Sequence, residues 1–432
     1  MDRAPDQSGS PQLPPPRGFL LTTGNFLGTL AAARDLGRHG IPVVLADATP
    51  DTLTGHSRFV TRSLACPGLD APEAWVQWLL DFGQREPGHV LYATSDDACW
   101  LLDQHHDALG RYFYLYQPRS GRLYEALNKK NLYAHCEALG IDQPAQYSPE
   151  QALSQPDAVA YPVLVKPQTL GGSVKTPKAV VVKNRAELQA TLAQARQRFS
   201  YHPAMLAHDP GLRDVMVQAY YPEAAGHVYS LAGFHAPEQD IYLLRACQKV
   251  LQHPLRFGVG LCFESRPVHP ALAGQLRRLM EALEYRGAFE VEFIHLESEN
   301  RFLLIDFNPR FYGQMGFDIA RGLPVARLCY LAAVGDGAAL RALAASAQRW
   351  DDVTRWHFRH EWMLKLFVTT HWLAGNLSRQ QRRDWLRWAQ GRPAEDPLRA
   401  TDDPAPAQAS RRNTWLGFLR TPGWTMRKFF RQ

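Results

Sequence analysis

The chain has 432 residues, a hydrophobic fraction of 45% and a formal net charge of +6 at pH 7. This length predicts two to four domains, with ample apolar content for their cores. The positive charge fits phosphate-bearing ligands but is too small to indicate nucleic-acid binding, and no run of about 18 apolar residues predicts a membrane span. We therefore expect a cytoplasmic protein that binds no nucleic acid.

The six cysteines are scattered along the chain and include no CxxC pair. A disulfide framework is unusual in a chain of this length, and the spacing of a zinc site is absent. We expect reduced and mostly buried thiols. The six are Cys66, Cys99, Cys136, Cys247, Cys262 and Cys329.

The amino-terminal residues 1–17 are polar and rich in proline, which predicts a disordered tail and neither a signal peptide nor an anchor. A strand-helix-strand pattern follows at residues 18–21, 26–39 and 41–46, which indicates an α/β domain. The glycines of its first turn lack the G-x-G-x-x-G spacing of a dinucleotide site, although Asp47 stands near the position of a ribose-binding acid. We therefore predict no nicotinamide site there.

A lysine next to a glycine-rich loop is placed to meet phosphate oxygens. Lys166 ends an apolar strand that begins at residue 161, and Gly171, Gly172 and Ser173 follow it. Glycines let backbone amides approach phosphate oxygens closely. A plain hairpin with an exposed lysine is the alternative interpretation.

Residues 287–314 predict a β-hairpin with one acidic face. Glu290 and Glu292 alternate with apolar residues in the first strand, and Asp306 and Asn308 do so in the second. If the polar turn between them forms, Glu292 lies opposite Asp306 and Glu290 opposite Asn308, with Cβ atoms roughly 5 Å apart. Two carboxylates that close repel unless a cation lies between them, and hard oxygen ligands suit Mg²⁺ carried on a phosphate.

The other face of this hairpin is expected to be apolar, with Leu303, Ile305 and Phe307 supplying it in the second strand. An acidic hairpin face is often only solvated surface. The run Asn308-Pro309-Arg310 favours a site instead, because proline ends the ladder and an arginine just beyond it can hold a phosphate oxygen by a bidentate fork.

These motifs resemble the ATP-grasp superfamily, and the chain looks like its branch of putative carboxylate–amine ligases. The likeness rests on Glu292, on the strand that ends in Asp306-Phe307-Asn308-Pro309-Arg310, and on Lys166 with its glycine loop. It covers roughly residues 18–333. The resemblance implies ATP with Mg²⁺, or with Mn²⁺ in its place. One departure is Asp306, where the family usually has the longer glutamate.

The resemblance also implies a role for each matching residue. The metal ligands would be Glu292, Asp306 and Asn308. Arg310 and Lys249 would be the catalytic cations, with Arg245 and Arg256 as competitors for the role of Lys249. The nucleotide would be held by Lys129, Lys166, Gly171, Gly172, Ser173, Gln218, Tyr220 and Glu223. Lys129 heads a predicted helix with Lys130, and paired lysines there are often only solvated surface.

The implied fold is α/β. A Rossmann-like domain would span residues 18–118, a two-lobed α+β ATP-grasp domain residues 119–345 with its lid at about 150–217, and a helical extension residues 346–432. Strand-end loops of the first domain would help to hold the acceptor substrate. The candidates for that role are Thr23, Asn25, Ser95 and Asp96, although helix capping also explains the last two.

The implied activity is a ligation in which ATP activates a substrate carboxylate as an acyl-phosphate and an amine, or another nucleophile, displaces the phosphate. A small-molecule carboxylate and an amine are the expected partners, and an oligomer is possible. A small-molecule kinase and a non-catalytic nucleotide-binding protein are the alternatives. The basic, aromatic residues 415–430 could touch a membrane surface weakly or form a terminal helix packed on the protein.

Overall fold

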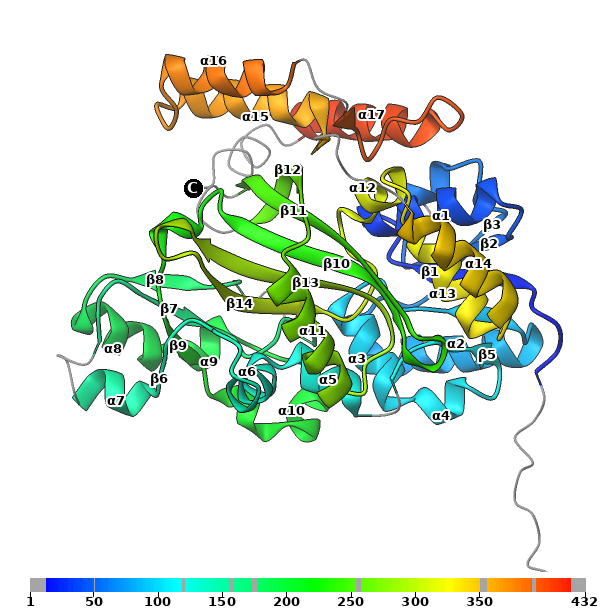
Figure 1. Cartoon of the computed structure of the whole chain (residues 1–432), viewed down its shortest axis with the longest axis horizontal. Coiled ribbons are helices and arrows are strands. Elements are labelled where there is room, and N and C mark those ends of the chain that lie inside the picture. Colours follow the sequence, from blue (N-terminus) through cyan, green and yellow to red (C-terminus); the bar gives the residue numbers. More distant parts are fainter. Residues whose placement is uncertain are drawn as a thin grey trace, which may run out of the picture.

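The protein is built on three β-sheets with helices packed around them, as the computed structural model shows (Figure 1). The structure describes residues 13–49, 51–118, 121–154, 159–172, 177–253, 258–349, 356–390 and 394–420. Within these residues no helix is long and apolar enough to cross a membrane. The α/β fold class is as predicted.

The first sheet has five parallel strands in the order β3-β2-β1-β4-β5. Its central strand β1 is buried on both faces. Helix α1 packs against Phe19 and Leu21, whereas α2 and α3 pack on the Leu20 side, as expected for a parallel sheet covered by helices. The bounds are β1 Gly18–Thr22, α1 Leu27–Arg38, β2 Val43–Asp47, β3 Arg62–Ala65, α2 Pro72–Arg85, β4 His89–Leu91, α3 Asp96–Gln104, α4 His106–Leu109 and β5 Phe113–Tyr114.

The residues just before β1 lie against this domain. The carbonyl of Pro14 accepts a hydrogen bond from Tyr114 Oη at 2.9 Å, and the backbone N–H of Arg17 donates to Gly88 at 2.9 Å. The last part of the tail predicted for residues 1–17 is therefore ordered, and residues 1–12 lie outside the described residues.

The second sheet is small and antiparallel, in the order β6-β9-β7-β8, with its own apolar cluster around Val163, Val165 and Val217. It lies where the lid was predicted. The bounds of this region and of the two helices before it are α5 Arg122–Leu127, α6 Lys129–Ala138, β6 Gln146–Tyr147, α7 Pro149–Ser154, β7 Val163–Lys166, β8 Val180–Val182, α8 Arg185–Ala193, α9 Ala195–Arg198, α10 Pro203–His208 and β9 Met216–Ala219.

The third sheet has seven strands in the order β14-β13-β10-β11-β12-β15-β16. All its pairs are antiparallel except β15 with β16. The bounds are β10 Val228–Ala236, β11 Ile241–His253, β12 Val259–Arg266, α11 Pro270–Ala282, β13 Gly287–Leu296, β14 Arg301–Asn308, α12 Met315–Ala320, α13 Val325–Ala333, α14 Gly337–Gln348, β15 His357–Arg359, α15 Glu361–Leu373, α16 Arg379–Trp388, β16 Ala394–Glu395 and α17 Ala405–Arg420.

The C-terminal extension is more than a set of helices. Its helices α15, α16 and α17, orange and red in Figure 1, lie above the β12 end of the large sheet. The extension also supplies β15, just before α15, and β16, between α16 and α17, and these two strands extend the sheet beyond β12. Two- and three-residue strands carry too little alternation to be recognised in a sequence.

The β13–β14 hairpin has the predicted register, with Glu292 opposite Asp306 and Glu290 opposite Asn308. A bulge follows, because Phe293 pairs with Leu304 and leaves Ile305 as an extra residue. The bulge shifts the alternation of side chains between the two faces of β14. Leu303 and Ile305 therefore join a small cluster on the acidic face, while Phe307 faces the main core. The prediction of one apolar face for these three residues is wrong.

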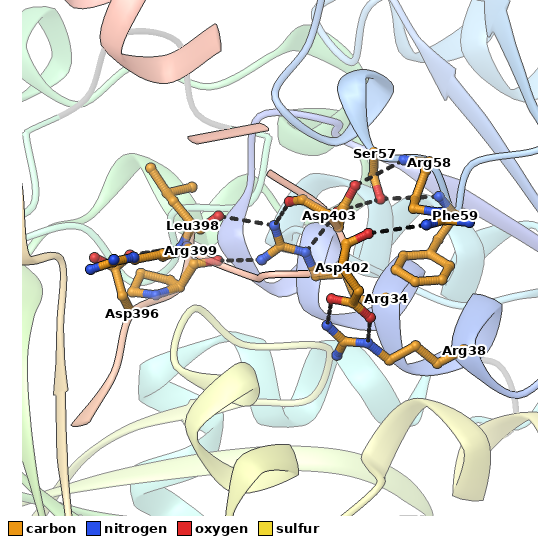
Figure 2. A network of polar contacts seen from close by, with 11 residues as sticks. Arg34, Arg38, Ser57, Arg58, Phe59, Asp396, Leu398, Arg399, Asp402 and Asp403 are labelled. Carbon is orange, nitrogen blue, oxygen red and sulfur yellow. Dashed lines mark hydrogen bonds and ion pairs between the residues drawn. The ribbon is translucent and has the colours of Figure 1, made fainter. Parts of the chain in front are cut away.

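Two aspartates fasten the C-terminal extension to the first domain (Figure 2). The carboxylate of Asp403, which is 1% exposed, accepts from Arg34 Nε at 2.8 Å, from Ser57 Oγ at 2.7 Å and from the backbone N–H of Arg58 at 2.9 Å. Arg34 also donates to three backbone carbonyls of the same segment, those of Pro397, Leu398 and Asp403. The neighbouring Asp402 binds Arg38 through both oxygens in a far more exposed pair.

Substitution Asp403→Ala should lower the free energy of unfolding by about 3–5 kcal/mol, because it leaves the buried charge of Arg34 without a partner. Substitution Asp402→Ala breaks a half-exposed pair and should cost at most about 1 kcal/mol. Urea unfolding followed by tryptophan fluorescence measures both. Equal losses in the two variants would contradict the structural role assigned to Asp403.

Candidate functional site

A cavity between the small sheet and the large sheet collects most of the residues singled out in the sequence. Apolar side chains of both sheets, including Leu164 of β7 and Ile294 of β13, form part of its wall. The predicted site residues that line it are Lys129, Lys166, Gln218, Tyr220, Lys249, Glu292 and Asp306. These residues come from α6, β7, β11, β13, β14 and the segment at the end of β9.

Two ion pairs balance the carboxylates of the hairpin. Lys249 Nζ lies 2.6 Å from Glu292 Oε1, and Lys129 Nζ lies 2.7 Å from Asp306 Oδ1. Burial acts to raise the pKa of Asp306, but Lys129 outweighs it and the pKa is lowered. In the same way the burial of Lys249 is outweighed by Glu292, so its pKa is raised. Asp306 is therefore ionised at neutral pH, and Lys129, whose pKa is raised by Asp306, and Lys249 are protonated.

Among the described residues, no carboxylate forms an ion pair with Lys166. Its Nζ donates to Tyr133 Oη at 3.1 Å and lies 5.3 Å from the centre of the Tyr133 ring. Burial, together with the positive charge of Lys129, lowers the pKa of Lys166 to about 7. An anion entering the cavity would restore the charge on this amine, because opposite charges favour the ionised form.

Tyr133 joins three elements at the base of the cavity. Its hydroxyl accepts from Lys166 and from Gln218 Nε2 at 3.2 Å, and donates to the carbonyl of Ile305 at 3.1 Å. The sequence analysis missed this residue. Tyr133 lies four residues after Lys129 and so on the same face of α6, which is the signal that could have found it.

Asn308 and Arg310 lie one rung further along the hairpin, next to the first domain. Arg310 donates through Nη2 to Asn308 Oδ1 at 2.8 Å and through Nε to Asp96 Oδ1 at 2.5 Å, and it covers the ring of Phe26. Asn308 Nδ2 donates to Glu290 at 3.2 Å. Burial and the charge of Glu292 raise the pKa of Glu290 to about 7.

The first turn of α3 also meets the glycine loop. The backbone N–H of Gly172 donates to Asp97 Oδ1 at 2.5 Å, and the backbone of Gly172 has φ +66°, a conformation that favours glycine. A Cβ atom on Gly171 would stand 3.3 Å from the carbonyl oxygen of Asp96. One helix start thus contacts both Arg310 and the loop. Sequence analysis missed Asp97.

Other candidates have different surroundings. Asn25 Oδ1 accepts from the backbone of Leu53, and Thr23 Oγ1 lies in a threonine cluster with Thr94, so both hold the first domain's own loops. Ser95 caps α3. The carboxylate of Asp47 accepts a hydrogen bond from the backbone N–H of Gly24 at 2.6 Å. This structural contact explains the acid at this position without a ribose.

Three of the candidate side chains are not described. Ser173 and the competing Arg256 lie outside the described residues, and the side chain of Glu223 is not described. Arg245 is buried and donates to the carbonyls of Arg321 and Ala347, so it has a structural role away from the cavity.

Comparison with known proteins gives relatives for part of the chain. No protein-family model matches it. The large chain of carbamoyl phosphate synthase from Thermus thermophilus is 27% identical over 227 residues. That match covers 49% of this chain and 20% of the relative, so the chain spans about a fifth of the length of the curated proteins it matches.

Solved structures match over a larger share of the chain. The L-amino acid ligase from Bacillus licheniformis has a TM-score of 0.55 at 13% identity, over 75% of each chain. The biotin carboxylase of Campylobacter jejuni, solved as a complex with β,γ-ATP, has a TM-score of 0.58 at 14% identity, over 75% of this chain and 71% of that one. The chain has the ATP-grasp fold. The cavity described above lies between the small sheet and the large sheet of this fold.

Substitution Tyr133→Phe should lower the free energy of unfolding by about 1–3 kcal/mol, because it leaves buried polar partners from three elements unsatisfied. Urea unfolding measures this loss. Tyr112→Phe is the matched control, since the structure gives the Tyr112 hydroxyl no hydrogen bond among the described residues, and it should change the stability little. A Tyr133→Phe variant as stable as the control would contradict the bridging role.

Proposed function

We propose that this protein is an ATP- and Mg²⁺-dependent ligase that activates a carboxylate as an acyl-phosphate and joins it to an amine, with release of ADP and phosphate. The observation that carries the proposal is the cavity in which Lys129, Lys166 and Lys249 surround the paired carboxylates of Glu292 and Asp306. Three amines around two acids fit a triphosphate with its metal far better than they fit a neutral ligand.

The donor set fits a magnesium ion carried on phosphates. Glu292 and Asp306 are directly opposed across one rung, and Asn308 offers a third hard oxygen on the next rung. Mg²⁺ bound there would neutralise phosphate charge. Lys129 and Lys249 would then transfer their hydrogen bonds from the carboxylates to phosphate oxygens, so the charge of the site stays balanced in both states.

Lys166, Gln218 and Tyr220 are assigned by their positions in the cavity, and Gly171 and Gly172 by the resemblance of their loop to the family's glycine loop. Lys166 would hold phosphate oxygens from the lid, and Gly171 with Gly172 would cover them with backbone amides. Gln218 and Tyr220, at the end of β9, would lie against the nucleoside. A ligand-bound solved structure of the same fold, the biotin carboxylase complex with β,γ-ATP, supports a nucleotide in this fold.

Arg310 is assigned to the reacting groups. The substrate carboxylate would attack the terminal phosphorus of ATP, and ADP would leave. The amine nitrogen would then attack the acyl carbon, phosphate would leave, and one proton would be released. The guanidinium of Arg310 would stabilise the negative charge that develops on the transferred group. Such chemistry depends on position and charge and needs no nucleophilic side chain.

The full chain with ATP, Mg²⁺ and pools of acids and amines tests the reaction class. A ligase releases ADP only when both an acid and an amine are present. Phosphorylated product without an amine would indicate the kinase alternative, and nucleotide binding without turnover would indicate the non-catalytic alternative.

The substitutions Glu292→Gln and Asp306→Asn should each reduce Mg²⁺-dependent ADP release about 100-fold or more, because an amide in place of the carboxylate removes a negative charge from the metal site and leaves a lysine unbalanced. A coupled ADP assay measures the rate. Glu299→Gln changes an exposed acid at the turn of the same hairpin and should leave the rate unchanged. Full activity in either site variant would refute the metal assignment.

Substitution Asp96→Asn should lower kcat by about 10- to 100-fold and leave the KM for ATP nearly unchanged. Asp96 touches Arg310 and none of the cavity-lining lysines, so its loss should misplace the guanidinium without weakening nucleotide binding. Steady-state kinetics separates the two constants. Asp107→Asn, in the exposed start of α4, is the control, and a KM effect as large as the kcat effect would contradict this positioning role.

A further inference from the structure

A second cavity, of about 440 Å³, lies between the first domain and the C-terminal extension. Helix α1, helix α12 and residues 395–402 form its walls, with Leu27, Ala31 and Ile319 among the apolar lining. None of the residues assigned to the nucleotide or the metal lines it. This cavity is therefore a separate site.

The arginines around this cavity already have partners. Figure 2 shows Arg34 turned to Asp403 and Arg38 turned to Asp402, with shortest distances of 2.8 and 2.7 Å. Arg399 lies 3.7 Å from Glu361. Each of these three arginines thus has a carboxylate partner within the protein. The cavity therefore presents no unpaired arginine among the described residues to an anion.

Glu395 is the acid left over. It lines the cavity from β16, where its backbone pairs with β15, and its partly buried carboxylate makes no hydrogen bond or ion pair with the described residues. Burial, with a smaller contribution from Asp396, raises the pKa of Glu395 to about 7, although Arg34 and Arg38 act in the opposite direction. A buried carboxylate of this kind is stabilised by a cation that hydrogen-bonds to it.

We propose that this cavity binds an organic ammonium compound, with the ammonium group on Glu395 and its apolar part along α1 and α12. A bare metal ion does not suit this cavity, because Asp402 is paired with Arg38, which leaves only the Glu395 carboxylate among apolar walls. The volume suits a small molecule with several carbon atoms. This inference does not depend on the proposed ligase activity, because binding can be measured without ATP.

The cavity adjoins the candidate active site through Phe26. Arg310 covers one side of the Phe26 ring, with 5.8 Å to its centre, whereas Leu27 and Gly313 line the cavity and a Cβ on Gly313 would stand 3.8 Å from the same ring. The ammonium compound could therefore be an amine substrate that extends past Phe26, or an effector. In either case the cavity would recognise the same groups, an ammonium on Glu395 and an apolar chain along α1 and α12.

Calorimetric titration of the full chain with n-hexylammonium at pH 8 tests the site, with n-hexanol and hexanoate as neutral and anionic matches. At this pH the Glu395 carboxyl is ionised and the amine is protonated. We expect n-hexylammonium to bind at least about tenfold more tightly than either match, and Glu395→Gln to remove that preference. The exposed Glu73→Gln in α2 is the control and should bind like the wild type.

A second variant tests the location independently of the charge. Ala31→Leu extends a side chain from α1 into the cavity and should weaken binding of n-hexylammonium about tenfold without a change in the thermal midpoint. No detectable binding, equal binding of n-hexanol, or unchanged affinity in both Glu395→Gln and Ala31→Leu would overturn the proposal.

Incubation with ATP, Mg²⁺ and an acid pool then distinguishes the sources. Incorporation of the amine into product identifies a substrate, and a changed rate of ADP release without incorporation identifies an effector. If no ADP is released in any of these incubations, the proposed ligase function is refuted, but the calorimetric evidence for the second cavity is unaffected.

Discussion

The charge balance of the hairpin is the constraint on which the site depends. Glu292 and Asp306 are opposed across one rung, and two partly buried carboxylates at that separation repel each other unless positive charge lies beside them. Lys129 comes to them from α6 and Lys249 from β11, so two ion pairs connect three separate parts of the chain. The pairing that neutralises the acids also fixes the distance between the helix and the sheet.

The parts of the site that the sequence could reveal are those set by local patterns. The register of Glu292 with Asp306 follows from strand alternation and one turn, both of which are local. The bulge at Ile305 is not visible in the sequence, because alternation alone assumes that each strand keeps step with its partner. A one-residue shift then places Leu303 and Ile305 on the face opposite to the expected one.

Contacts between distant segments of the chain were the other feature that the sequence could not predict. Tyr133 carries a helical signal, but nothing local shows that its hydroxyl meets Lys166 and Ile305 from two different sheets. Asp96 was readable as a helix-capping acid and Asp97 was not singled out, and only the fold brings them to Arg310 and Gly172. The parallel sheet of the first domain was predictable because its central strands β1 and β2 are short apolar runs that are buried on both faces, whereas β15 and β16 were too short to recognise.

The two short strands of the C-terminal extension have a consequence for the solution behaviour of the protein. Strand β15 covers Cys262, Phe263 and Glu264 of β12, and β12 would otherwise end the large sheet with unpaired backbone groups. Open edges of this kind recruit strands from other molecules. A chain that ends before residue 356 would keep the residues of the candidate active site but would expose the backbone groups of β12. We therefore expect such a chain to self-associate through this edge, so the extension covers the sheet edge as well as forming a wall of the second cavity.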